Sequence, residues 1–592
     1  MAIMESLGFA RDFTRVEDAR VVENENAIRW DVSGDFVVVG YGGAGVAAAL
    51  QACENGLDVI ALDRFEGGGS TAMNGGIYYA GGGTSIQKAA GVEDSPEAMF
   101  EYLEREVQGV VSDETLHRFC DTSVATMDWL MGKGVEFNPT YYPKKTSYPA
   151  RGIYLYHPDN TLLPAYRGKH PPAARGHKSF LDLGNAAQGF GRALFEPLRD
   201  AAAAQGVRVM RFTEARQLML DPSGRVLGIK ALHVSPDHPS YQALVDAQRA
   251  TAKWLLMLPT AMPGAQVTLA IGKRFARKAA QIEANAAKEV FIRAREGICL
   301  SSGGFIQNQK MLKYYAPRFE KVMPVGSLGD DGSGILLGHS AGGALDRMGT
   351  ISAWRFLNPP SAWAEGMLVN AQGARYVNES SYGATVGEAM MKPENNGIAW
   401  LIMDEALWRK ARHQLKHDNM LPFQRDPARL TMLIRSKKAA TVEMLGKKLG
   451  FDSATFAATV AAYAEAAAER APDAFQKAPA DMGKFTSGPF HAIDLGLESP
   501  FFPCPSITVG GLKVEETSGL VLREDGSSIP GLYAAGRTAI GICSNLYMSG
   551  LSAADCIFAG RRAGNHVAGR GRERQAGEAY SKVSDRAVSP SC

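Results

Sequence analysis

The segment VVVGYGGAGVAAAL, residues 37–50, constrains the fold more than any other part of the chain. An apolar β-branched run ends at Gly40, two more glycines follow at Gly42 and Gly45, and an alanine-rich stretch continues to Glu54. This order predicts a buried strand, a tight turn and a helix. DVIALD, residues 58–63, has the pattern of a second buried strand. Together the segments predict a βαβ unit with parallel strands.

The glycine spacing in this unit is typical of a loop that binds a dinucleotide. The first glycine permits the turn, the second lets the backbone approach a pyrophosphate, and the third lets the helix pack on the strand. Asp63 ends the second predicted strand, where a carboxylate binds ribose hydroxyls. The alternative is a glycine turn without a ligand. The predicted dinucleotide-binding residues of this unit are Gly40, Gly42, Gly43, Ala44, Gly45, Asp63 and Arg64.

Further segments favour FAD over NAD. The C-terminal stretch GLYAAGRTAIGICSNLYMSGLSAADCIFAGRRAG, residues 531–564, predicts a strand, a glycine turn and a helix from near Ser552. The positive end of that helix would stabilise charge on a reduced flavin. Arg537 is predicted either to contact the pyrophosphate or to form a surface ion pair. A second glycine-rich loop and two later glycines complete the predicted FAD site: Gly69, Ser70, Thr71, Asn74, Gly75, Gly76, Gly304 and Gly536.

Changes in texture along the chain predict its domain organisation. Residues 1–343 form the first part of the cofactor-binding domain, with an insertion at about 235–290, and residues 500–592 form its C-terminal part. Residues 344–499 form a separate cap domain. Helices are predicted at 95–108, 113–132, 437–450 and 453–470, whereas the stretch 139–176, rich in proline and tyrosine, is predicted to be irregular.

Composition excludes several classes of function. The net charge is +2, so nothing indicates binding to nucleic acid. Seven scattered cysteines without a CxxC spacing favour reduced thiols in the cytoplasm over disulfides or a metal site. The N-terminal stretch lacks the apolar region of a secretory signal. Residues 254–271 are uncharged but interrupted by prolines, which predicts either a buried or oligomer-facing excursion or a peripheral membrane contact.

Four more segments support a resemblance over nearly the whole chain: SSGGF (301–305), LVNAQGARYVNE (368–379), PFHAI (489–493) and TVGGL (508–512). With the glycine motifs, they resemble the FAD-dependent fumarate reductase/succinate dehydrogenase-like flavoprotein superfamily. The resemblance implies an α/β fold, a Rossmann-like FAD-binding domain with an inserted α+β catalytic cap. Fumarate reductases clamp two carboxylates with cations, but the loop GICSNLYMSG, residues 541–550, contains none. A neutral apolar substrate is therefore expected.

This loop resembles that of the 3-ketosteroid dehydrogenases, and its YMSGLS wording is most similar to the 3-oxo-5α-steroid 4-dehydrogenases. YYPKKTSYP (141–149) and PAARGH (172–177) extend the resemblance. It implies introduction of a C=C bond next to the 3-keto group of a steroid-like ketone, with loss of an α-proton and transfer of a hydride to FAD. The Δ1-dehydrogenases share the tyrosine but differ at Gly550-Leu551-Ser552. A fumarate- or enoate-type reductase and a non-catalytic flavin-binding protein remain further alternatives.

The resemblance also implies site residues. Tyr547 and Ser549 are expected to polarise the ketone, and Tyr382 is expected to accept the proton, although these roles could be exchanged; Tyr376 is the alternative to Tyr382. In purely structural interpretations, Tyr547 packs on the flavin, Ser549 caps a helix and Tyr382 is a core residue. The predicted substrate-binding residues are Tyr141, Tyr142, Asn545, Tyr547 and Ser549. The electron acceptor and oligomeric state stay open, and no metal site is predicted.

Overall fold

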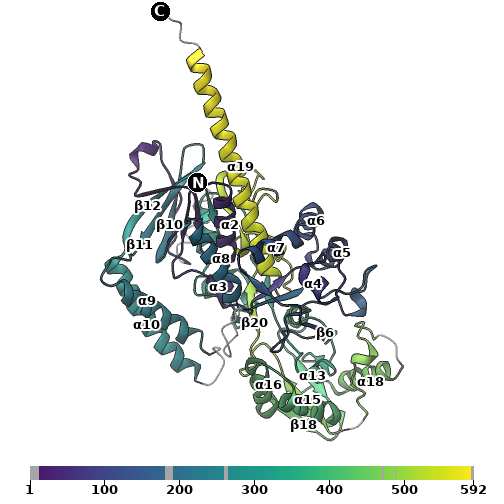
Figure 1. Cartoon of the computed structure of the whole chain (residues 1–592). Helices are drawn as coiled ribbons and strands as arrows, with labels where there is room; N and C mark the ends of the chain where they lie inside the picture. Colours follow the sequence, from purple (N-terminus) through teal and green to yellow (C-terminus); the bar gives the residue numbers. More distant parts are fainter. Residues whose placement is uncertain (1–12, 181–190, 259–263, 470–472, 487, 588–592) are drawn as a thin grey trace, which may run out of the picture.

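The computed structural model of the chain describes residues 13–180, 191–258, 264–469, 473–486 and 488–587, with side chains as far as Gly571 (Figure 1). The predicted segment 254–271 is therefore described on both sides of residues 259–263, which lie outside the described residues.

The central sheet has the strand order β1-β10-β11-β12-β2-β3-β9, and β23 pairs with β12 and β22. Its inner strands β2, β3, β12 and β23 run parallel, as expected for continuous apolar runs buried on both faces. The predicted βαβ unit forms from β2, α2 and β3. The bounds are β1 (Arg20–Val21), β2 (Val32–Val39), α2 (Gly43–Glu54), β3 (Val59–Leu62), β9 (Arg208–Met210), β10 (Thr213–Leu220), β11 (Val226–His233), β12 (Lys288–Leu300), β22 (Leu520–Leu522) and β23 (Ser528–Ala534).

The C-terminal helix α19 (Leu551–Ala587) packs along α2, although the two helices are some 500 residues apart in sequence (Figure 1). Gly560 and Gly564 of α19 make this approach possible, because a Cβ atom at either position would collide with the backbone of α2. The remaining elements of the FAD-binding part are η2 (Glu25–Ala27), α8 (Arg192–Ala204), α11 (Gln309–Tyr315), η5 (Pro317–Phe319), α12 (Ser333–Ser340), β14 (Leu345–Asp346), β21 (Gly511–Leu512) and η7 (Gly536–Thr538).

The stretch predicted to be irregular, 139–176, instead contributes to a second sheet. Its strands pair because the chain folds back on itself: β6 runs parallel to β7, and β7 is antiparallel to β8. The proline-rich composition hid these short strands, which tertiary pairing stabilises. The bounds are β4 (Ile77–Tyr79), β5 (Glu136–Phe137), β6 (Tyr141–Lys145), β7 (Leu155–His157), η3 (Pro164–Tyr166) and β8 (Gly176–Phe180).

Two helix predictions require correction. The predicted helix 113–132 is two helices, which meet at Thr122, a residue whose backbone leaves the helical region. The predicted helix 437–450 begins too early, because β18 (Ser436–Ala439) pairs with β19 and only then does Thr441 cap α17 (Val442–Leu449). The helices of the N-terminal part are α3 (Gly69–Met73), α4 (Ser85–Ala89), α5 (Pro96–Val107), α6 (Asp113–Asp121) and α7 (Ser123–Gly132).

The cap is a separate sheet-and-helix unit with the strand order β16-β17-β19-β18. Within its core, Glu379 and Lys477 form a fully buried ion pair of 2.9 Å, and Arg375 pairs with Glu379 at 2.7 Å. Its elements are α13 (Ser361–Ala364), β16 (Met367–Val369), α14 (Gly383–Met391), β17 (Trp400–Met403), α15 (Glu405–His417), α16 (Pro422–Ile434), α18 (Ser453–Glu469), η6 (Pro479–Asp481) and β19 (Phe490–Asp494).

The chain crosses between the two units through β15 (Ile351–Ala353), which pairs with β20 (Pro505–Thr508) beside β13 (Met323–Pro324). Arg355 follows β15 and is fully buried. Its guanidinium donates to the carbonyls of Phe502 and Gly496 at 2.7 and 3.2 Å, and its N–H donates to the carbonyl of Gly383 at 2.7 Å. The entry and exit of the cap are thereby joined.

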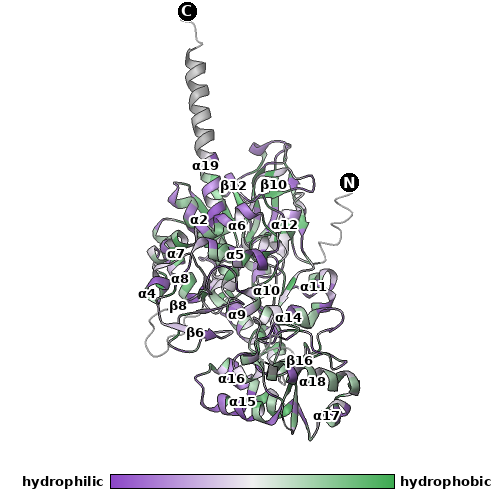
Figure 2. Cartoon of the chain, turned by 90° about the vertical axis from the view of Figure 1, so that its right-hand side faces the viewer, coloured by the Kyte–Doolittle hydropathy of each residue, from purple (hydrophilic) through white to green (hydrophobic). Residues whose placement is uncertain are grey.

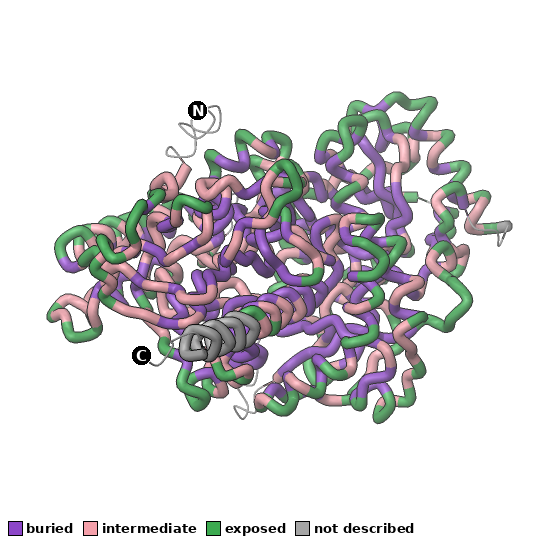
Figure 3. The backbone as a smooth tube through the Cα atoms, turned by 90° about the horizontal axis from the view of Figure 1, so that it is seen from above, coloured by how far each residue is buried: buried purple, intermediate pink, exposed green. Residues whose placement is uncertain are grey.

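The segment predicted as an insertion forms two long helices between β11 and β12, α9 (Tyr241–Leu255) and α10 (Ala265–Ala286). They pack on each other and project from the side of the central sheet (teal in Figure 1). Hydrophobic residues gather in the strands and inner helix faces, whereas hydrophilic residues cover outer helices such as α15 and α16 (Figure 2). Buried backbone accordingly fills the interior, and exposed turns line the periphery (Figure 3).

Candidate active site

The N-terminus of α2 has the geometry of a pyrophosphate-binding turn. Gly40 has φ +97°, and a Cβ atom there would lie 2.6 Å from the Cα of Ser302, so only glycine fits. At Gly45 a Cβ atom would collide with the carbonyl of Gly40, which explains the third glycine. At Gly42, by contrast, the nearest atom to a Cβ would be the carbonyl oxygen of Gly68 at 3.8 Å. The second glycine therefore faces open space, as phosphate binding at a helix N-terminus requires.

The carboxylate of Asp63 connects the glycine turn before α2 with the loop that follows β3. It accepts hydrogen bonds from the backbone N–H groups of Tyr41 at 2.9 Å and Phe65 at 2.8 Å. Burial raises its pKa, and these backbone hydrogen bonds oppose that rise. Arg64 points elsewhere and pairs with Asp331 at 2.9 Å. Two backbone hydrogen bonds thus hold the carboxylate that follows β3, and its binding of a ribose stays a prediction.

The second glycine-rich loop folds back onto the first. The hydroxyl of Thr71 accepts a hydrogen bond from the N–H of Gly43 at 3.0 Å, which links α3 to the first turn of α2. Asn74 accepts from the N–H of Gly76 at 2.8 Å and closes the following turn. The hydroxyl of Tyr148 donates to the carbonyl of Gly75 at 2.6 Å. Gly69 begins α3, so the predicted loop residues do lie beside the predicted pyrophosphate turn.

Arg537 forms an ion pair, but the pair is buried and not on the surface as one of the two predictions had it, and contact with the pyrophosphate stays a prediction. It forms a buried ion pair with Asp330, with its Nη2 2.9 Å from both carboxylate oxygens, and Asp330 also bonds the hydroxyl of Ser70. Its Nη1 is buried and has no hydrogen-bond partner among the described residues. A Cβ atom at Gly304 would lie 3.5 Å from that nitrogen, and Gly536 packs against Ala44 of α2.

A buried donor without a partner is costly unless a ligand completes it. The open face of Gly42, the carboxylate of Asp63 and the free nitrogen of Arg537 therefore fit a bound dinucleotide such as FAD. The Arg537–Asp330–Ser70 network joins the C-terminal glycine turn to the second glycine-rich loop. These residues would hold the pyrophosphate side of the cofactor from both ends of the sequence.

The loop between η7 and α19, residues 539–550, is hydrogen-bonded to Asp555 of α19. The carboxylate of Asp555 accepts a hydrogen bond from the N–H of Cys543 at 3.2 Å, and the hydroxyl of Ser544 accepts from the N–H of Gly541 at 3.0 Å. The helix begins at Leu551, so Ser552 lies in its first turn. The positive end of α19 is therefore directed at the same loop.

The three predicted catalytic residues lie together, although two come from this loop and one from the cap. Ser549 is buried, and Tyr382 is 2% exposed. Burial raises the pKa of Tyr382 and of Tyr547, and both tyrosines hydrogen-bond Ser549, which opposes that rise. A third tyrosine joins them: Tyr156 of β7 donates its hydroxyl proton to Ser549 at 2.9 Å. We call these four residues the tyrosine–serine cluster.

Two aromatic side chains that follow β15 wall the tyrosine–serine cluster. The ring of Trp354 stacks on that of Tyr547, with 4.5 Å between centroids and 25° between planes. The ring of Phe356 lies 5.8 Å from that of Tyr382. The cluster is therefore bounded by flat apolar surfaces, which suit a rigid apolar substrate better than a charged one.

Burial sets the protonation of the cluster. It raises the pKa of Tyr547 to about 12 and the pKa values of Tyr382 and Tyr156 well above the usual value of a tyrosine. A raised pKa means that the neutral hydroxyl is favoured over the phenolate. At neutral pH the cluster consequently presents uncharged O–H donors, which can bind a carbonyl oxygen and the negative charge that develops on an enolate.

The other predicted substrate residues are placed differently. The hydroxyl of Tyr141 hydrogen-bonds His157 at 2.9 Å, and Tyr142 is half-buried and pairs with Tyr156 across β6 and β7. Asn545 donates to the carbonyl of Glu106 at 2.8 Å and accepts from Arg347 at 3.4 Å. The amide of Asn545 thus joins the loop to neighbouring elements, and Tyr141 and Tyr142 lie on the strand beside the cluster.

A buried polar network contacts the backbone of Tyr382 through Asn160. The side-chain oxygen of Asn160 accepts a hydrogen bond from the N–H of Tyr382 at 2.6 Å, and its amide nitrogen donates to Thr385 at 2.9 Å and to Glu106 at 3.2 Å. Glu106 also accepts from the hydroxyl of Tyr102 at 2.6 Å. Burial raises the pKa of Glu106 to about 7.

Sequence analysis missed Tyr156, Trp354, Phe356, Asn160 and Glu106. Tyr156 lies in a segment predicted to be irregular, and the alternation LYH was the only local signal of its strand. The aromatic pair in SAWRF was visible, but nothing in the sequence indicated that it faces Tyr547 and Tyr382. Asn160 and Glu106 carry no motif, because their role depends on contacts between distant elements.

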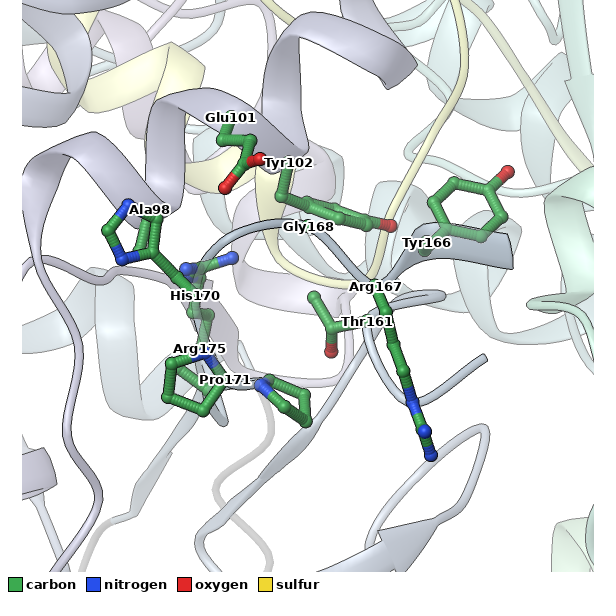
Figure 4. Close-up of a pocket in the computed structure, with 12 residues that line it drawn as sticks. Ala98, Glu101, Tyr102, Thr161, Tyr166, Arg167, Gly168, His170, Pro171 and Arg175 are labelled. Atoms are coloured by element: carbon green, nitrogen blue, oxygen red, sulfur yellow. The ribbon is translucent and has the colours of Figure 1, made fainter. Parts of the chain in front are cut away.

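A shallow pocket lies on the far side of the same network (Figure 4). Its lining includes Tyr102 and the buried Arg175, together with Tyr166, Arg167 and His170. Arg175 forms a buried ion pair with Asp94 at 2.7 Å, so it holds the long loop rather than presenting a free charge. The pocket is separate from the tyrosine–serine cluster.

Comparison with known proteins agrees with this geometry. The family described as "FAD binding domain" matches residues 35–550. A 3-oxo-5-alpha-steroid 4-dehydrogenase of Comamonas testosteroni is 35% identical over 522 residues, which cover 87% of this chain and 94% of that protein. A 3-oxosteroid 1-dehydrogenase of Mycolicibacterium smegmatis is 27% identical, covering 87% of this chain and 93% of that protein.

Solved structures give the same picture. A 3-ketosteroid-delta4-(5alpha)-dehydrogenase from Rhodococcus jostii, solved with 4-androstene-3,17-dione, has 30% identity and a TM-score of 0.73 over 93% of this chain and 99% of that one. A 3-ketosteroid delta1-dehydrogenase from Sterolibacterium denitrificans shares the fold, with 18% identity and a TM-score of 0.61 over 91% of this chain and 100% of that one.

Proposed function

The chain belongs to the FAD-binding-domain family of flavoprotein oxidoreductases, and we propose that it is a 3-ketosteroid dehydrogenase of the Δ4 type. Its cofactor is FAD and its fold is that of the ketosteroid dehydrogenases and fumarate reductases. The proposed reaction introduces a C=C bond next to the 3-keto group of a saturated steroid-like ketone. The observation that carries the proposal is the tyrosine–serine cluster, a set of neutral hydroxyl donors walled by Trp354 and Phe356.

The reaction removes a proton from the carbon α to the ketone and a hydride from the β carbon. Bound FAD supplies the two-electron acceptor for the hydride. In this scheme Tyr547 and Ser549 donate hydrogen bonds to the ketone oxygen, which lowers the pKa of the α-proton. Tyr382 takes that proton on its phenolic oxygen while its own hydroxyl proton moves along the hydrogen bond to Ser549 and from Ser549 to the ketone oxygen, so no phenolate is required. The proton that reaches the ketone oxygen is released as the hydride leaves and the C=C bond forms.

Regiochemistry is tested by product analysis. The FAD-loaded protein is incubated with an artificial electron acceptor and either a 5α-3-ketosteroid or a 4-ene-3-ketosteroid. The Δ4 proposal expects turnover of the saturated 5α-substrate to the 4-ene product. Turnover of the 4-ene substrate to a 1,4-diene would instead identify a Δ1-dehydrogenase. Oxidation of the pre-reduced flavin by fumarate or an enoate, without reaction on steroids, would favour a reductase, and no turnover at all would favour a non-catalytic flavoprotein.

The cluster is tested by removing single hydroxyls. We expect Tyr547→Phe and Tyr382→Phe each to lower kcat by roughly 100- to 1,000-fold, the loss seen when one donor to an oxyanion is removed. Bound FAD, measured by its absorbance, should be unchanged. Tyr376→Phe is the matched control, because the hydroxyl of Tyr376 lies 3.4 Å from the carbonyl of Ile398, away from Ser549. Full activity in Tyr547→Phe would contradict the assignment.

We further propose a peripheral membrane contact through residues 254–271, which would bring the protein to the surface where an apolar steroid partitions. Met257 and Val267 are exposed by 43% and 63% near the free ends of α9 and α10, and Lys253, Arg274 and Lys278 flank them. In the described part of the chain, no helix is both long enough and apolar enough to cross a bilayer. A cytoplasmic location and an electron acceptor outside the protein complete the proposal.

A further inference from the structure

The α9–α10 hairpin is attached to the central sheet at one narrow place. The strands on either side of it remain paired to their ends, where His233 lies opposite Lys288. A small apolar cluster at this place holds the base of the hairpin, with the ring of Phe212 edge-on to Tyr241 at 5.2 Å. The buried members are Phe212, Val234, Leu244, Val245, Ala247, Ala279 and Ala286. The hairpin is therefore packed onto the body through Phe212.

That attachment leads directly to the loop that follows Asp63. The N–H of Phe212 donates to the carbonyl of Phe65 at 3.2 Å, and the N–H of Thr213 donates to the carbonyl of Asp63 at 2.8 Å. On the hairpin, the guanidinium of Arg249 donates to both carboxylate oxygens of Glu66, at 2.7 and 2.6 Å. Movement of α9 is thus coupled to the loop that presents the ribose-binding carboxylate.

Between the hairpin and this loop lies a groove of about 470 Å³. Arg64, Phe65 and Leu328 form the wall on the body, and residues of α9 and α10 form the opposite wall. Small-molecule sites in proteins have volumes of about 300–1,000 Å³, so the groove has room for part of a nucleotide.

The groove carries positive charge. Its lining contains Arg15, Arg64, Lys273 and Arg277, against the single carboxylate of Glu283. Arg64 is neutralised by Asp331, at 2.9 Å. For Lys273 and Arg277, no carboxylate of the described residues lies within ion-pair distance. The positive charges of Lys273 and Arg277, both in α10, are therefore available to a ligand in the groove.

The position of Asp63 indicates which ligand this is. In a dinucleotide bound with its pyrophosphate at the N-terminus of α2 and its ribose at Asp63, the adenine lies beyond the ribose. Arg64 and Phe65, the residues immediately after Asp63, line the groove. We infer that the α9–α10 hairpin closes over the adenosine end of bound FAD and slows its release, with the charged side chains of Lys273 and Arg277 donating hydrogen bonds to the acceptor atoms of the adenosine. The inference rests on FAD binding and is independent of the proposed steroid chemistry.

The experiment measures the rate of FAD release rather than activity. Holoenzyme is mixed with an excess of an apoflavoprotein that traps free FAD, and the return of signal gives the dissociation rate. We expect Lys273→Ala/Arg277→Ala to release FAD about tenfold faster, the factor that the loss of one charge-assisted contact represents. Arg274→Ala/Lys278→Ala is the matched control, since it removes the same charge from exposed positions of α10 outside the groove. Equal release from the two variants would overturn the inference.

A second variant removes the hairpin altogether. Because His233 and Lys288 are paired, residues 234–287 can be replaced by Asn-Gly, the preferred two-residue turn between antiparallel strands. Faster FAD release from this protein supports the inference, and unchanged release overturns it. A different result is that FAD release is unchanged in every variant, while the holoenzyme binds ADP and Lys273→Ala/Arg277→Ala abolishes that binding. This result would overturn the inference and make the groove a separate nucleotide site. FAD release as expected but no ketosteroid turnover would contradict the proposed function alone.

Discussion

At the scale of single residues, the site contains tyrosine hydroxyls that burial keeps protonated and a carboxyl, Glu106, whose pKa burial raises. Tyr547, Tyr382 and Tyr156 retain their protons because phenolate charge is poorly solvated in the interior. Glu106 behaves in the same way: it is 3% exposed, and burial raises its pKa to about 7 although Tyr102 and Asn160 donate to it. Donors to a ketone and the network behind them therefore share one physical cause.

Glu106 gives a prediction about stability and pH. Because its pKa in the folded state is raised above that of the unfolded chain, folding binds its proton more tightly, and this contribution is complete below about pH 4.5 and lost as pH rises through about 7. Glu106→Gln keeps the acceptor oxygen and removes the titration. We expect the variant to be more stable than the parent at pH 8, by up to about 3 kcal/mol, with the advantage disappearing towards pH 4.5.

The measurement is urea unfolding of both holoproteins at pH 5 and pH 8. His177 contributes in the opposite sense at acid pH, because burial lowers its pKa to about 4, so stability is lost as pH falls below its usual value. That contribution is common to both proteins and cancels in the difference between them. An equal difference in unfolding free energy at the two pH values would show that Glu106 does not titrate as the structure indicates.

At the scale of elements, α14 determines where Tyr382 lies. Tyr382 is the residue that precedes the helix, and its N–H donates to Asn160, from the loop after β7, rather than to a residue of its own segment. The same segment is held on its other side by the buried ion pair of Glu379 with Lys477. Tyr382, the tyrosine of the cap that we propose as catalytic, is thus oriented partly by the FAD-binding domain.

Asn160 is therefore a positioning residue, and its removal should affect turnover more than folding alone explains. We expect Asn160→Ala to lower kcat about tenfold to 100-fold while KM changes less, because the tyrosine hydroxyl is displaced in the transition state. Asn160→Asp, which keeps the oxygen that accepts from Tyr382, should recover part of kcat. Both constants come from steady-state kinetics with a dye acceptor.

Asn370 provides the control for this prediction. It is also a buried asparagine, but its oxygen accepts hydrogen bonds from Gln372 and Ala374 within a turn of the cap. Asn370→Ala should cost similar stability, about 1–3 kcal/mol, and leave kcat near that of the parent. If Asn370→Ala and Asn160→Ala lowered kcat equally, the effect would reflect loss of folding and not orientation of Tyr382.

At the scale of the whole molecule, segments from both ends of the chain meet at one site. Gly536 packs on Ala44 beside the first glycine turn, Ser549 of the C-terminal loop contacts Tyr382 of the cap, and Arg355 joins the entry of the cap to its exit. The α9–α10 hairpin projects beyond this body (Figure 1). Its base packs on Phe212 beside the loop that follows Asp63, and its free ends carry exposed apolar residues.

The free ends of the hairpin allow a test of membrane contact. We expect the protein to float with vesicles that contain anionic phospholipid, and Met257→Asp/Val267→Asp to lower the floated fraction several-fold, since a carboxylate is repelled from and poorly soluble in that interface. Met444→Asp is the control, because Met444 is 58% exposed on α17 of the cap. Equal losses in both variants, or no flotation of the parent, would contradict a contact through residues 254–271.

By itself the sequence determined the fold class and the cofactor, and it predicted the chemistry of the C-terminal loop. Local patterns suffice for these, because a strand, a glycine turn and a helix must follow one another to bind a dinucleotide, and the two hydroxyls of the loop, at Tyr547 and Ser549, are separated only by Met548. Sequence could not determine short strands such as β6 and β7, which exist only because they pair with each other, or β18, whose edge pairing with β19 overrides its helical composition.

Only the tertiary structure determined which residues surround the tyrosine–serine cluster. Tyr156, Trp354 and Asn160 come from three separate segments, and their distances from Ser549, Tyr547 and Tyr382 follow from how the two domains pack. The same packing buried Arg537 against Asp330 and placed the α9–α10 hairpin over the loop after Asp63. Contacts between distant segments depend on the summed burial of the whole chain, which no local pattern encodes.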